Sequence, residues 1–124
     1  MSLQSHLGRV RGLGSAKDGT HHWWWQRLTA IALVPLSIWF VCGLLDVLDS
    51  SYSEATAWVA KPHVTVLLLV FVAALFYHMK LGMQVVIEDY LHVEWMKISA
   101  LIALKFACAL GAIAAIVAIL KISL

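Results

Sequence analysis

The chain has 124 residues, of which 62% are hydrophobic and only 13% are charged. A soluble domain of this length needs far more polar surface, so the composition indicates an integral membrane protein with a single domain, residues 1–124. The net charge is +2 and the basic residues form no long run, which argues against a nucleic-acid partner. Cys42 and Cys108 form no CxxC or CxxCH motif, which argues against iron–sulfur, zinc and covalently attached haem sites.

The first 26 residues are polar and basic, with Arg9, Arg11 and Lys17 against the single acid Asp18. Their glycine and serine content is typical of turns and loops. We therefore expect a polar amino-terminal tail that is irregular or only partly helical.

Three apolar stretches follow, at about residues 27–47, 63–88 and 98–120. Each supplies about 20 or more residues, enough to cross a hydrocarbon layer of about 30 Å as a helix. Spanning strands are excluded, because closed barrels are built from alternating segments of about 10 residues. The predicted fold is all-α, a bundle of three transmembrane helices in the lipid bilayer.

Two features suit helices in lipid. Pro35 lies within the first stretch and predicts a kink, which a membrane bundle tolerates. Small residues recur in the third stretch at spacings of three and four, which allows another helix to approach closely. These residues are Ala103, Ala107, Gly111, Ala115 and Ala118.

The charges around the first stretch predict the orientation of the chain. The tail and Arg27 place four basic residues at its amino-terminal end, whereas the next connection carries three acids against Lys61. An excess of Lys and Arg marks the cytoplasmic side of a membrane protein. We therefore expect the amino terminus to be cytoplasmic.

The most informative polar residue is His78, which lies deep in the second stretch, about 15 residues from its outer end and about 10 from its inner end. An ionisable side chain at this depth costs about 2–3 kcal/mol and needs a compensating interaction. Gly82 lies one turn onward on the same face, and Asp89 returns to nearly that face about 16 Å further on. An imidazole nitrogen can ligate haem iron, and a nearby glycine leaves room for the flat macrocycle. From position alone, His78 is either a haem b ligand or a histidine hydrogen-bonded to a neighbouring helix.

The other two stretches contain no histidine, and His63 lies about 22 Å from His78 along the same helix. A haem held by two histidines would therefore take its second ligand from another chain. This chain is not expected to hold the cofactor alone.

Further polar residues have both functional and ordinary interpretations. Asp89 and Tyr90 lie where the second helix meets the inner interface, and there a phenol can hydrogen-bond a carbonyl while a carboxylate relays protons. The ordinary alternative is an interfacial tyrosine beside a solvated acid.

His21 and Arg27 flank a run of tryptophans and could bind haem propionates, since Arg pairs with carboxylates bidentately. The ordinary alternative is a positive anchor at the interface.

Lys80 and Lys105 lie within the second and third stretches. Their side chains are expected to extend toward an interface, as long basic side chains do in membranes. The alternative is an anionic partner inside the bundle.

Two motifs resemble a known family, the small membrane-anchor subunit of succinate dehydrogenase, which is the hydrophobic cytochrome b component of respiratory complex II. The first motif is His78-x3-Gly82-Met83-x5-Asp89-Tyr90. It is similar to the family's haem-ligand histidine followed by its quinone-site Asp-Tyr pair, with agreement in both spacing and depth.

The second motif is His21-x5-Arg27-x-Thr29-Ala30, at the entry to the first span. The two matches together cover about residues 12–95, while the third span resembles the family only in hydropathy and small-residue content. The doubled histidine at positions 21 and 22 leaves open which of the two is the propionate partner.

The resemblance implies that His78 is one axial ligand of a single haem b, whose other ligand comes from the larger cytochrome b subunit. It implies that Tyr90 hydrogen-bonds a ubiquinone carbonyl, that Asp89 assists proton uptake, and that His21 and Arg27 lie near the haem propionates. The implied soluble partners are an iron–sulfur subunit and a flavoprotein subunit. The implied location is the bacterial cytoplasmic membrane, with the mitochondrial inner membrane as the second choice.

The expected function is therefore that of a membrane anchor in succinate:ubiquinone oxidoreductase, which is not an enzyme by itself. One alternative is the anchor of a quinol:fumarate reductase, because the direction of the reaction depends on the quinone potential. A second is a haem-free proton-conducting or transport subunit that uses His78, Lys80, Lys105 and Asp89 as a relay. The third is a haem-free packing subunit.

Overall fold

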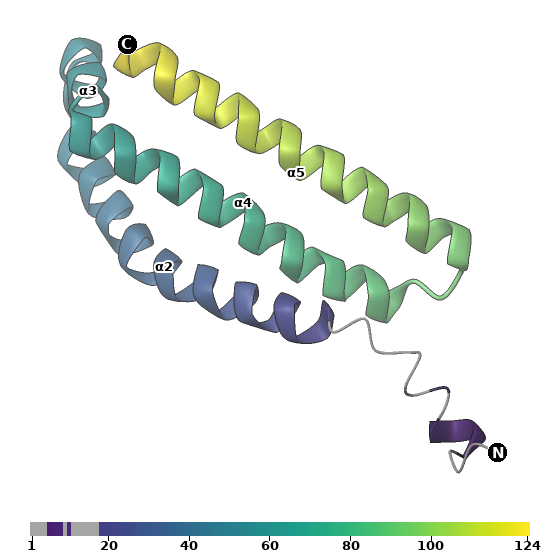
Figure 1. Cartoon of the computed structure of the whole chain (residues 1–124). Coiled ribbons are helices and arrows are strands. Elements are labelled where there is room, and N and C mark those ends of the chain that lie inside the picture. Colours follow the sequence, from purple (N-terminus) through teal and green to yellow (C-terminus); the bar gives the residue numbers. More distant parts are fainter. Residues whose placement is uncertain (1–4, 9, 11–17) are drawn as a thin grey trace.

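The structure is a computed structural model that describes residues 5–8, 10 and 18–124 (Figure 1). The described part is helical, without strands, and confirms the predicted all-α fold. Its main helices are α2 (Asp18–Val47), α3 (Tyr52–Val59), α4 (Pro62–Tyr90) and α5 (Glu94–Ser123). Three of the four are long and apolar enough to cross a membrane. Arg9, Arg11 and Lys17, used above to predict the tail and its orientation, lie outside the described residues.

The first long helix begins much earlier than the apolar stretch that predicted it. Residues 18–26 are helical and continuous with the span, so the amino-terminal region is partly helical as expected, but the first span begins earlier than predicted. The physical reason is that no glycine or proline lies between Gly19 and Pro35, so nothing interrupts the helix once it has formed. The polar residues at the start of α2 are consequently held on a helical face with a fixed spacing.

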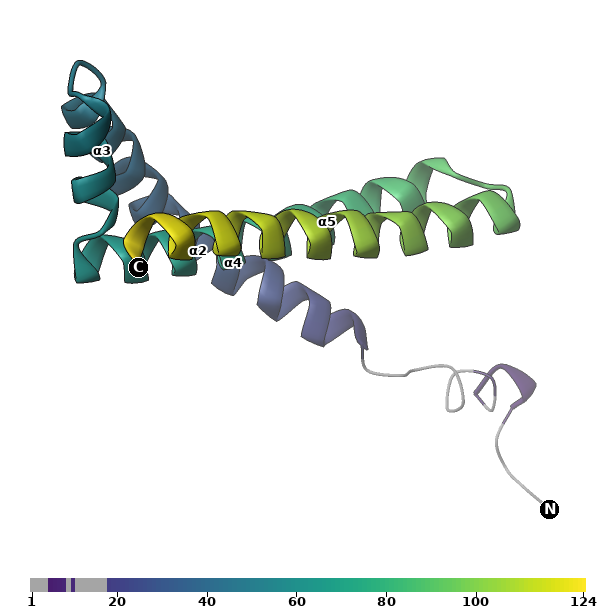
Figure 2. The same cartoon turned by 90° about the horizontal axis from the view of Figure 1, so that it is seen from above.

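α4 and α5 form an antiparallel pair joined by only three residues, 91–93, and they lie side by side along their length (Figures 1 and 2). Their close approach depends on Gly111, since an added Cβ there would lie 2.5 Å from Cε1 of Phe76. Cys108 is buried nearby, as a small hydrophobic residue would be. Of the small residues predicted to admit a helix, Ala103, Ala107 and Ala118 are instead exposed.

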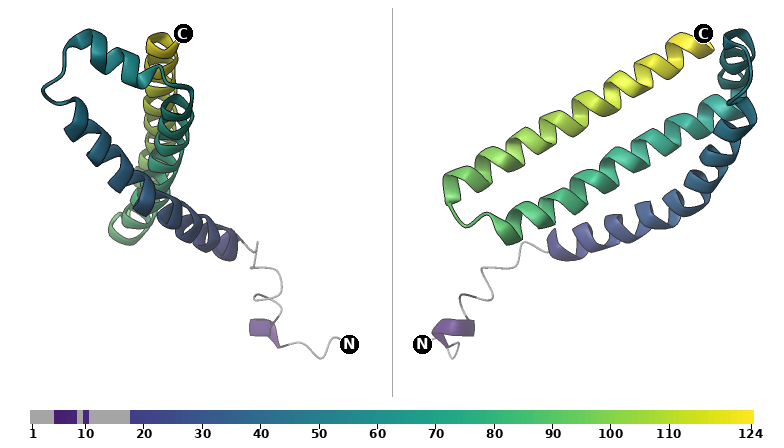
Figure 3. Two further views of the ribbon diagram at one scale, coloured as in Figure 1. Left: turned by 90° about the vertical axis from the view of Figure 1, so that its left-hand side faces the viewer. Right: turned by 180° about the vertical axis from the view of Figure 1, so that it is seen from behind.

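α2 packs against the opposite side of α4 and crosses it obliquely (Figures 2 and 3). α2 curves along its length, with Pro35 inside it (Figure 1). A proline there removes one backbone hydrogen bond and bends the helix. The rings of Phe40 and Phe71, 4.9 Å apart, join the two helices toward the α3 end.

The short helix α3 was not predicted, although the sequence carries a signal for it. Ser51 is its N-cap and Glu54 the third helical residue, and each side chain bonds the other's backbone in a capping box. The amide and hydroxyl of Ser51 both donate to the Glu54 carboxylate and hold its pKa below the ordinary value. Trp58 stacks on Trp39 at 6.1 Å and lies against Gly43, which fixes α3 to α2.

Much of the helix surface is not covered by the chain itself. In the most apolar 18-residue stretch of α4, only 22% of the residues are buried. The corresponding shares in α2 and α5 are 11% and 6%. Three such helices expose large apolar side chains along their whole length. In a membrane these surfaces contact lipid or other apolar helices.

Candidate functional site

The polar residues of the first two spans meet in one contact, which we call the polar seam: His22, Gln26 and Thr29 of α2 against His78 and Gly82 of α4. The three α2 residues are four and three positions apart and therefore share one helical face. Thr29 is buried and the other two are half-buried. His78 is also half-buried, on the side of α4 that faces α2.

A hydrogen bond between the side chains of His78 and Thr29 crosses the seam. Nδ1 of the His78 ring lies 2.9 Å from Oγ1 of Thr29. The same hydroxyl lies 2.7 Å from the carbonyl oxygen of Trp25, one turn earlier on α2. The His78 ring is thus directed toward α2, and it is held by a buried group from another span.

The other ring nitrogen of His78, Nε2, has no hydrogen-bond partner within the described part of the chain. An imidazole with one nitrogen held by a neighbour and the other available is the usual arrangement of a histidine that ligates a metal. The hydrogen bond to a neighbouring helix, one of the two interpretations drawn from the sequence, is therefore present. It leaves the second ring nitrogen available, so the haem-ligand interpretation stays a prediction.

Gly82 faces α2. An added Cβ at Gly82 would lie 3.7 Å from Nε2 of Gln26, which is ordinary van der Waals contact. The space beside Gly82, which the sequence suggested would admit a macrocycle, is thus bordered by the end of the Gln26 side chain.

Next to the seam, α4 presents an uncovered face, which we call the α4 flank: Leu75, Met79, Met83, Val86 and Tyr90. Spacings of three and four place these residues in one row on the helix. All five are exposed, Tyr90 most of all at 77%. The row begins beside His78 and ends where α4 ends, so a second protein covering it would also contact the seam.

Asp89 and Tyr90 occupy the last two positions of α4, and both are exposed. The structure leaves the phenol and the carboxylate accessible from outside the chain. They lie at the end of the α4 flank, about 18 Å along the helix axis from His78.

His21 and Arg27 are not brought together. They are six residues apart on α2, which places them about 120° apart around the helix. His21 is exposed with its ring edge toward Trp25, 6.4 Å away. The Arg27 guanidinium lies over the ring of Trp23 at 5.4 Å.

His22 and Gln26 also face α4: His22 lines a pocket with Gln84 and Glu88, and Gln26 lies beside Gly82. The sequence named His22 only as the second member of the doubled histidine, and it did not name Gln26. Nε2 of His22 and Oε1 of Gln26 are buried without a hydrogen-bond partner in the described residues. Buried polar atoms are nearly always paired, so these two atoms are available to a hydrogen-bond partner beyond the described residues. The signal for them was available, since positions 22, 26 and 29 follow one helical face.

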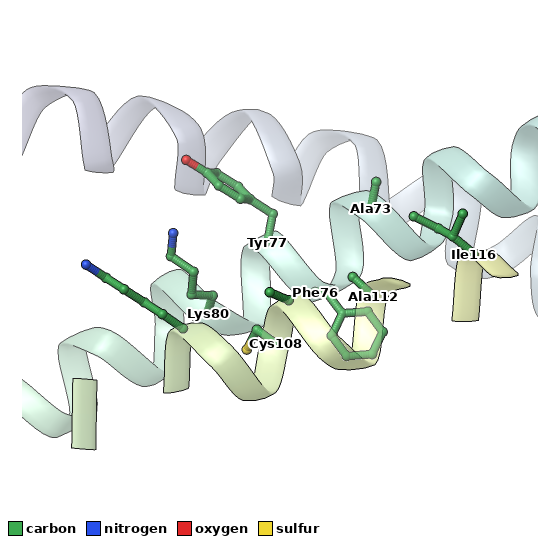
Figure 4. A pocket seen from close by; sticks show the side chains of 9 residues that line it. Ala73, Phe76, Tyr77, Lys80, Cys108, Ala112 and Ile116 are labelled. Carbon is green, nitrogen blue, oxygen red and sulfur yellow. The ribbon is translucent and has the colours of Figure 1, made fainter. Parts of the chain in front are cut away.

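Lys80 and Lys105 line one groove of about 410 Å³ between α4 and α5, on the side of α4 away from the seam. Figure 4 shows Lys80 extending beside Tyr77, and its Nζ lies 5.0 Å from the centre of that ring. This contact is a cation–π interaction. The remaining wall is apolar, with Phe76, Cys108 and several alanines.

The donor set limits what the site can hold. No group of three or more His, Cys, Asp or Glu residues that could hold a metal ion occurs among the described residues. A single available imidazole suits haem iron, because the macrocycle supplies the in-plane ligands and one protein nitrogen fills an axial position. The two unpartnered atoms of His22 and Gln26 are further polar groups for such a ligand. The residues present therefore fit a haem whose second axial ligand comes from elsewhere.

Comparison with known proteins identifies the family. The family model described as "Succinate dehydrogenase/Fumarate reductase transmembrane subunit" matches residues 1–118. The chain belongs to this family. The match includes all of α2, α3 and α4 and most of α5, so the polar seam and the α4 flank both lie within it.

Individual members of the family are similar over nearly the whole chain. A succinate dehydrogenase hydrophobic membrane anchor subunit from Rickettsia bellii is 37% identical over 117 residues, 94% of each chain. The corresponding protein of Paracoccus denitrificans is 30% identical over 81 residues, 65% of this chain and 63% of its own. A succinate dehydrogenase membrane anchor subunit from Reclinomonas americana is 28% identical over 92 residues, 72% of this chain and 77% of its own. No solved structure matches the chain.

Proposed function

We propose that the chain is the membrane-anchor subunit of a succinate:ubiquinone oxidoreductase. It docks an iron–sulfur subunit and, through that subunit, a flavoprotein to the membrane, and it is not catalytic alone. Membership of the family, the three apolar helices and the names of the relatives support this proposal. The extensive uncovered apolar surface supports assembly with a second anchor, the larger cytochrome b subunit.

We propose that Nε2 of His78 is one axial ligand of a haem b shared with that larger subunit. The observation that carries this step is the His78 ring, whose Nδ1 is held by Thr29 while Nε2 stays available beside the uncovered α4 flank. Bound haem supplies a one-electron redox centre within the membrane. Gly82 has no side chain to fill the space beside His78, whereas a larger residue there would extend toward Gln26.

His21 and Arg27 are proposed to lie near the haem propionates, as the resemblance to the family implies. Their places on α2, to either side of the polar seam, allow each to approach a different edge of a bound macrocycle. The geometry also favours His22 as a propionate partner, because its ring faces α4 and carries a buried, unpartnered Nε2.

Tyr90 and Asp89 are proposed to form this chain's part of the ubiquinone site. The Tyr90 hydroxyl would donate a hydrogen bond to a quinone carbonyl and polarise it, and the Asp89 carboxylate would deliver a proton from the aqueous side. Their exposure at the end of α4 supports this role, since a quinone between subunits must be reached from outside this chain.

The proposed location is the bacterial cytoplasmic membrane, with the amino terminus in the cytoplasm. The start of α2, the end of α4 and the start of α5 lie at the same end of the bundle (Figure 1). Tyr90 would then lie on the cytoplasmic side, where electrons arrive from the iron–sulfur subunit.

The haem proposal is tested in the complex purified from membranes. The wild-type complex should show a b-type reduced-minus-oxidised absorption spectrum, and His78→Ala should abolish or strongly reduce it. His63→Ala is the matched control, since His63 is exposed at the opposite end of the same helix. A His78→Ala complex with unchanged haem content and spectrum would rule out the ligand role.

The quinone proposal is tested with Tyr90→Phe, which removes only the hydroxyl. Losing one hydrogen bond to a reacting group should slow quinone reduction by about 10-fold or more, while succinate oxidation by artificial acceptors continues. Tyr52→Phe is the control, since Tyr52 is exposed on α3 at the other end of the bundle. Equal loss of both activities would indicate an assembly defect and reject the specific role.

One alternative is supported by the family description itself, which includes fumarate reductase. The same architecture would then serve quinol oxidation. Rates of succinate oxidation with ubiquinone and of fumarate reduction with a low-potential quinol, measured on one preparation, decide between the two. A faster fumarate reduction would replace the proposed direction.

A further inference from the structure

Thr29 occupies an unusual position for a hydroxyl in a membrane-spanning helix. Among the polar and charged residues that the structure describes, Thr29 is the one that is buried, with 7% of its surface exposed. Its Oγ1 is within hydrogen-bond distance of two carbonyl oxygens of its own helix, those of Trp25 at 2.7 Å and Gln26 at 3.2 Å. A third neighbour, Nδ1 of His78 at 2.9 Å, comes from α4.

The protons of this cluster can be assigned from chemistry. A threonine hydroxyl has one proton to donate, and a backbone carbonyl can only accept. The shortest contact is to the carbonyl of Trp25, so the Thr29 proton lies there. The oxygen of Thr29 then accepts, and the remaining contact requires Nδ1 of His78 to carry a proton and donate it.

A neutral imidazole carries a single N–H, so a proton on Nδ1 leaves Nε2 with its lone pair exposed. The opposite assignment, with Thr29 donating to Nδ1, would place the proton on Nε2 and block that nitrogen as a ligand. The hydrogen bond therefore selects one of the two tautomers, and it also fixes the rotation of the ring.

We propose that Thr29 is a positioning residue that sets the tautomer and orientation of His78, so that Nε2 presents its lone pair to the haem iron. This inference rests on the proposed haem-ligand role of His78. An acceptor on the distal nitrogen of a ligating histidine increases the electron donation of the ring and strengthens its bond to the metal. Thr29 acts only through His78 and does not contact the iron.

The test uses the whole complex, with Thr29→Val as the variant that keeps the shape of threonine but removes the acceptor. We expect haem to be lost about 10–100-fold more readily in competition with a soluble haem acceptor, as for other residues that support a metal-bound histidine. The haem midpoint potential should rise, because a less electron-rich imidazole stabilises ferric iron less. Thr29→Ser, which keeps the hydroxyl, should resemble wild type in both measurements.

Thr65→Val is the matched control, because the Thr65 hydroxyl bonds the carbonyl of Val59, away from His78. If Thr29→Val does not assemble, the pair Thr29→Ala and Thr29→Ser makes the same comparison, since these differ from each other only by the hydroxyl. Equal haem affinity and equal midpoint potential in Thr29→Val and Thr29→Ser, or in Thr29→Ala and Thr29→Ser, would overturn the inference. Loss of haem in His78→Ala together with that equality would reject only the role of Thr29, whereas normal haem in His78→Ala would reject the ligand proposal itself.

Discussion

The two contacts that α4 makes with its neighbours are of opposite kinds. Against α5, α4 fits by shape, with the ring of Phe76 lying where Gly111 has no side chain. Against α2, in the half of α4 that ends at Tyr90, α4 presents the polar seam, with a histidine and a threonine hydrogen-bonded across the contact. Among the described residues, the buried polar atoms without a hydrogen-bond partner belong to His22 and Gln26, and both lie in the second contact.

The difference separates a contact made by close packing from one that contains unpaired polar atoms. Helices in lipid associate through close packing of small residues, and α4 and α5 meet in this way at Gly111. Buried polar groups are costly unless they are paired, so the unpaired atoms of the seam are what the proposed haem would satisfy. Substitutions in the two contacts should therefore fail in different ways.

The largest effect is expected at Gly111. In Gly111→Ala the new Cβ would lie 2.5 Å from Phe76, closer than real contacts allow, so the ring or the helix must shift. Overpacking of this kind costs about 1–3 kcal/mol. The measurement is the thermal unfolding temperature of the purified complex, which should fall, together with a lower yield of assembled complex.

Gly82→Ala is the matched control for the other contact, since it makes the same chemical change in a spanning helix. Its Cβ would be in ordinary contact with Gln26, so the packing between α2 and α4 should tolerate it. Haem content is measured on both variants, so that loss of cofactor is separated from loss of packing. Equal destabilisation by the two substitutions would contradict the distinction between the contacts.

An intermediate effect is expected at the doubled histidine. His22→Phe should reduce haem retention by about 10-fold, the effect of losing one hydrogen bond to a charged group, because the His22 ring faces α4. The same change at the exposed His21 should have a smaller effect. Haem per complex after detergent purification is the readout, and the reverse order would restore His21 as the main propionate partner.

Much of this arrangement was predictable from the sequence because membrane helices follow simple rules. The three apolar stretches gave the all-α fold, and the depth of His78 identified the residue around which the polar contact forms. The start of α2 was predicted too late, since hydropathy marks the extent of the apolar region and not the end of the helix. The pairing of His78 with Thr29 could not be predicted, because it depends on the crossing of two helices.

The smallest effect is expected at α3, which lies outside both contacts. Hydrogen bonds from Ser51 hold the pKa of Glu54 below its ordinary value, so the charged carboxylate stabilises the start of α3 above the ordinary carboxyl range. That stability is lost as the pH falls through the lowered pKa and the carboxylate is protonated. Glu54→Ala should therefore speed hydrogen exchange of α3 amides at neutral pH. At a pH below the carboxyl range, wild type and variant should exchange alike, while haem content and the α4–α5 contact remain unchanged. A difference that persists at low pH would show that Glu54 acts through packing and not through its charge.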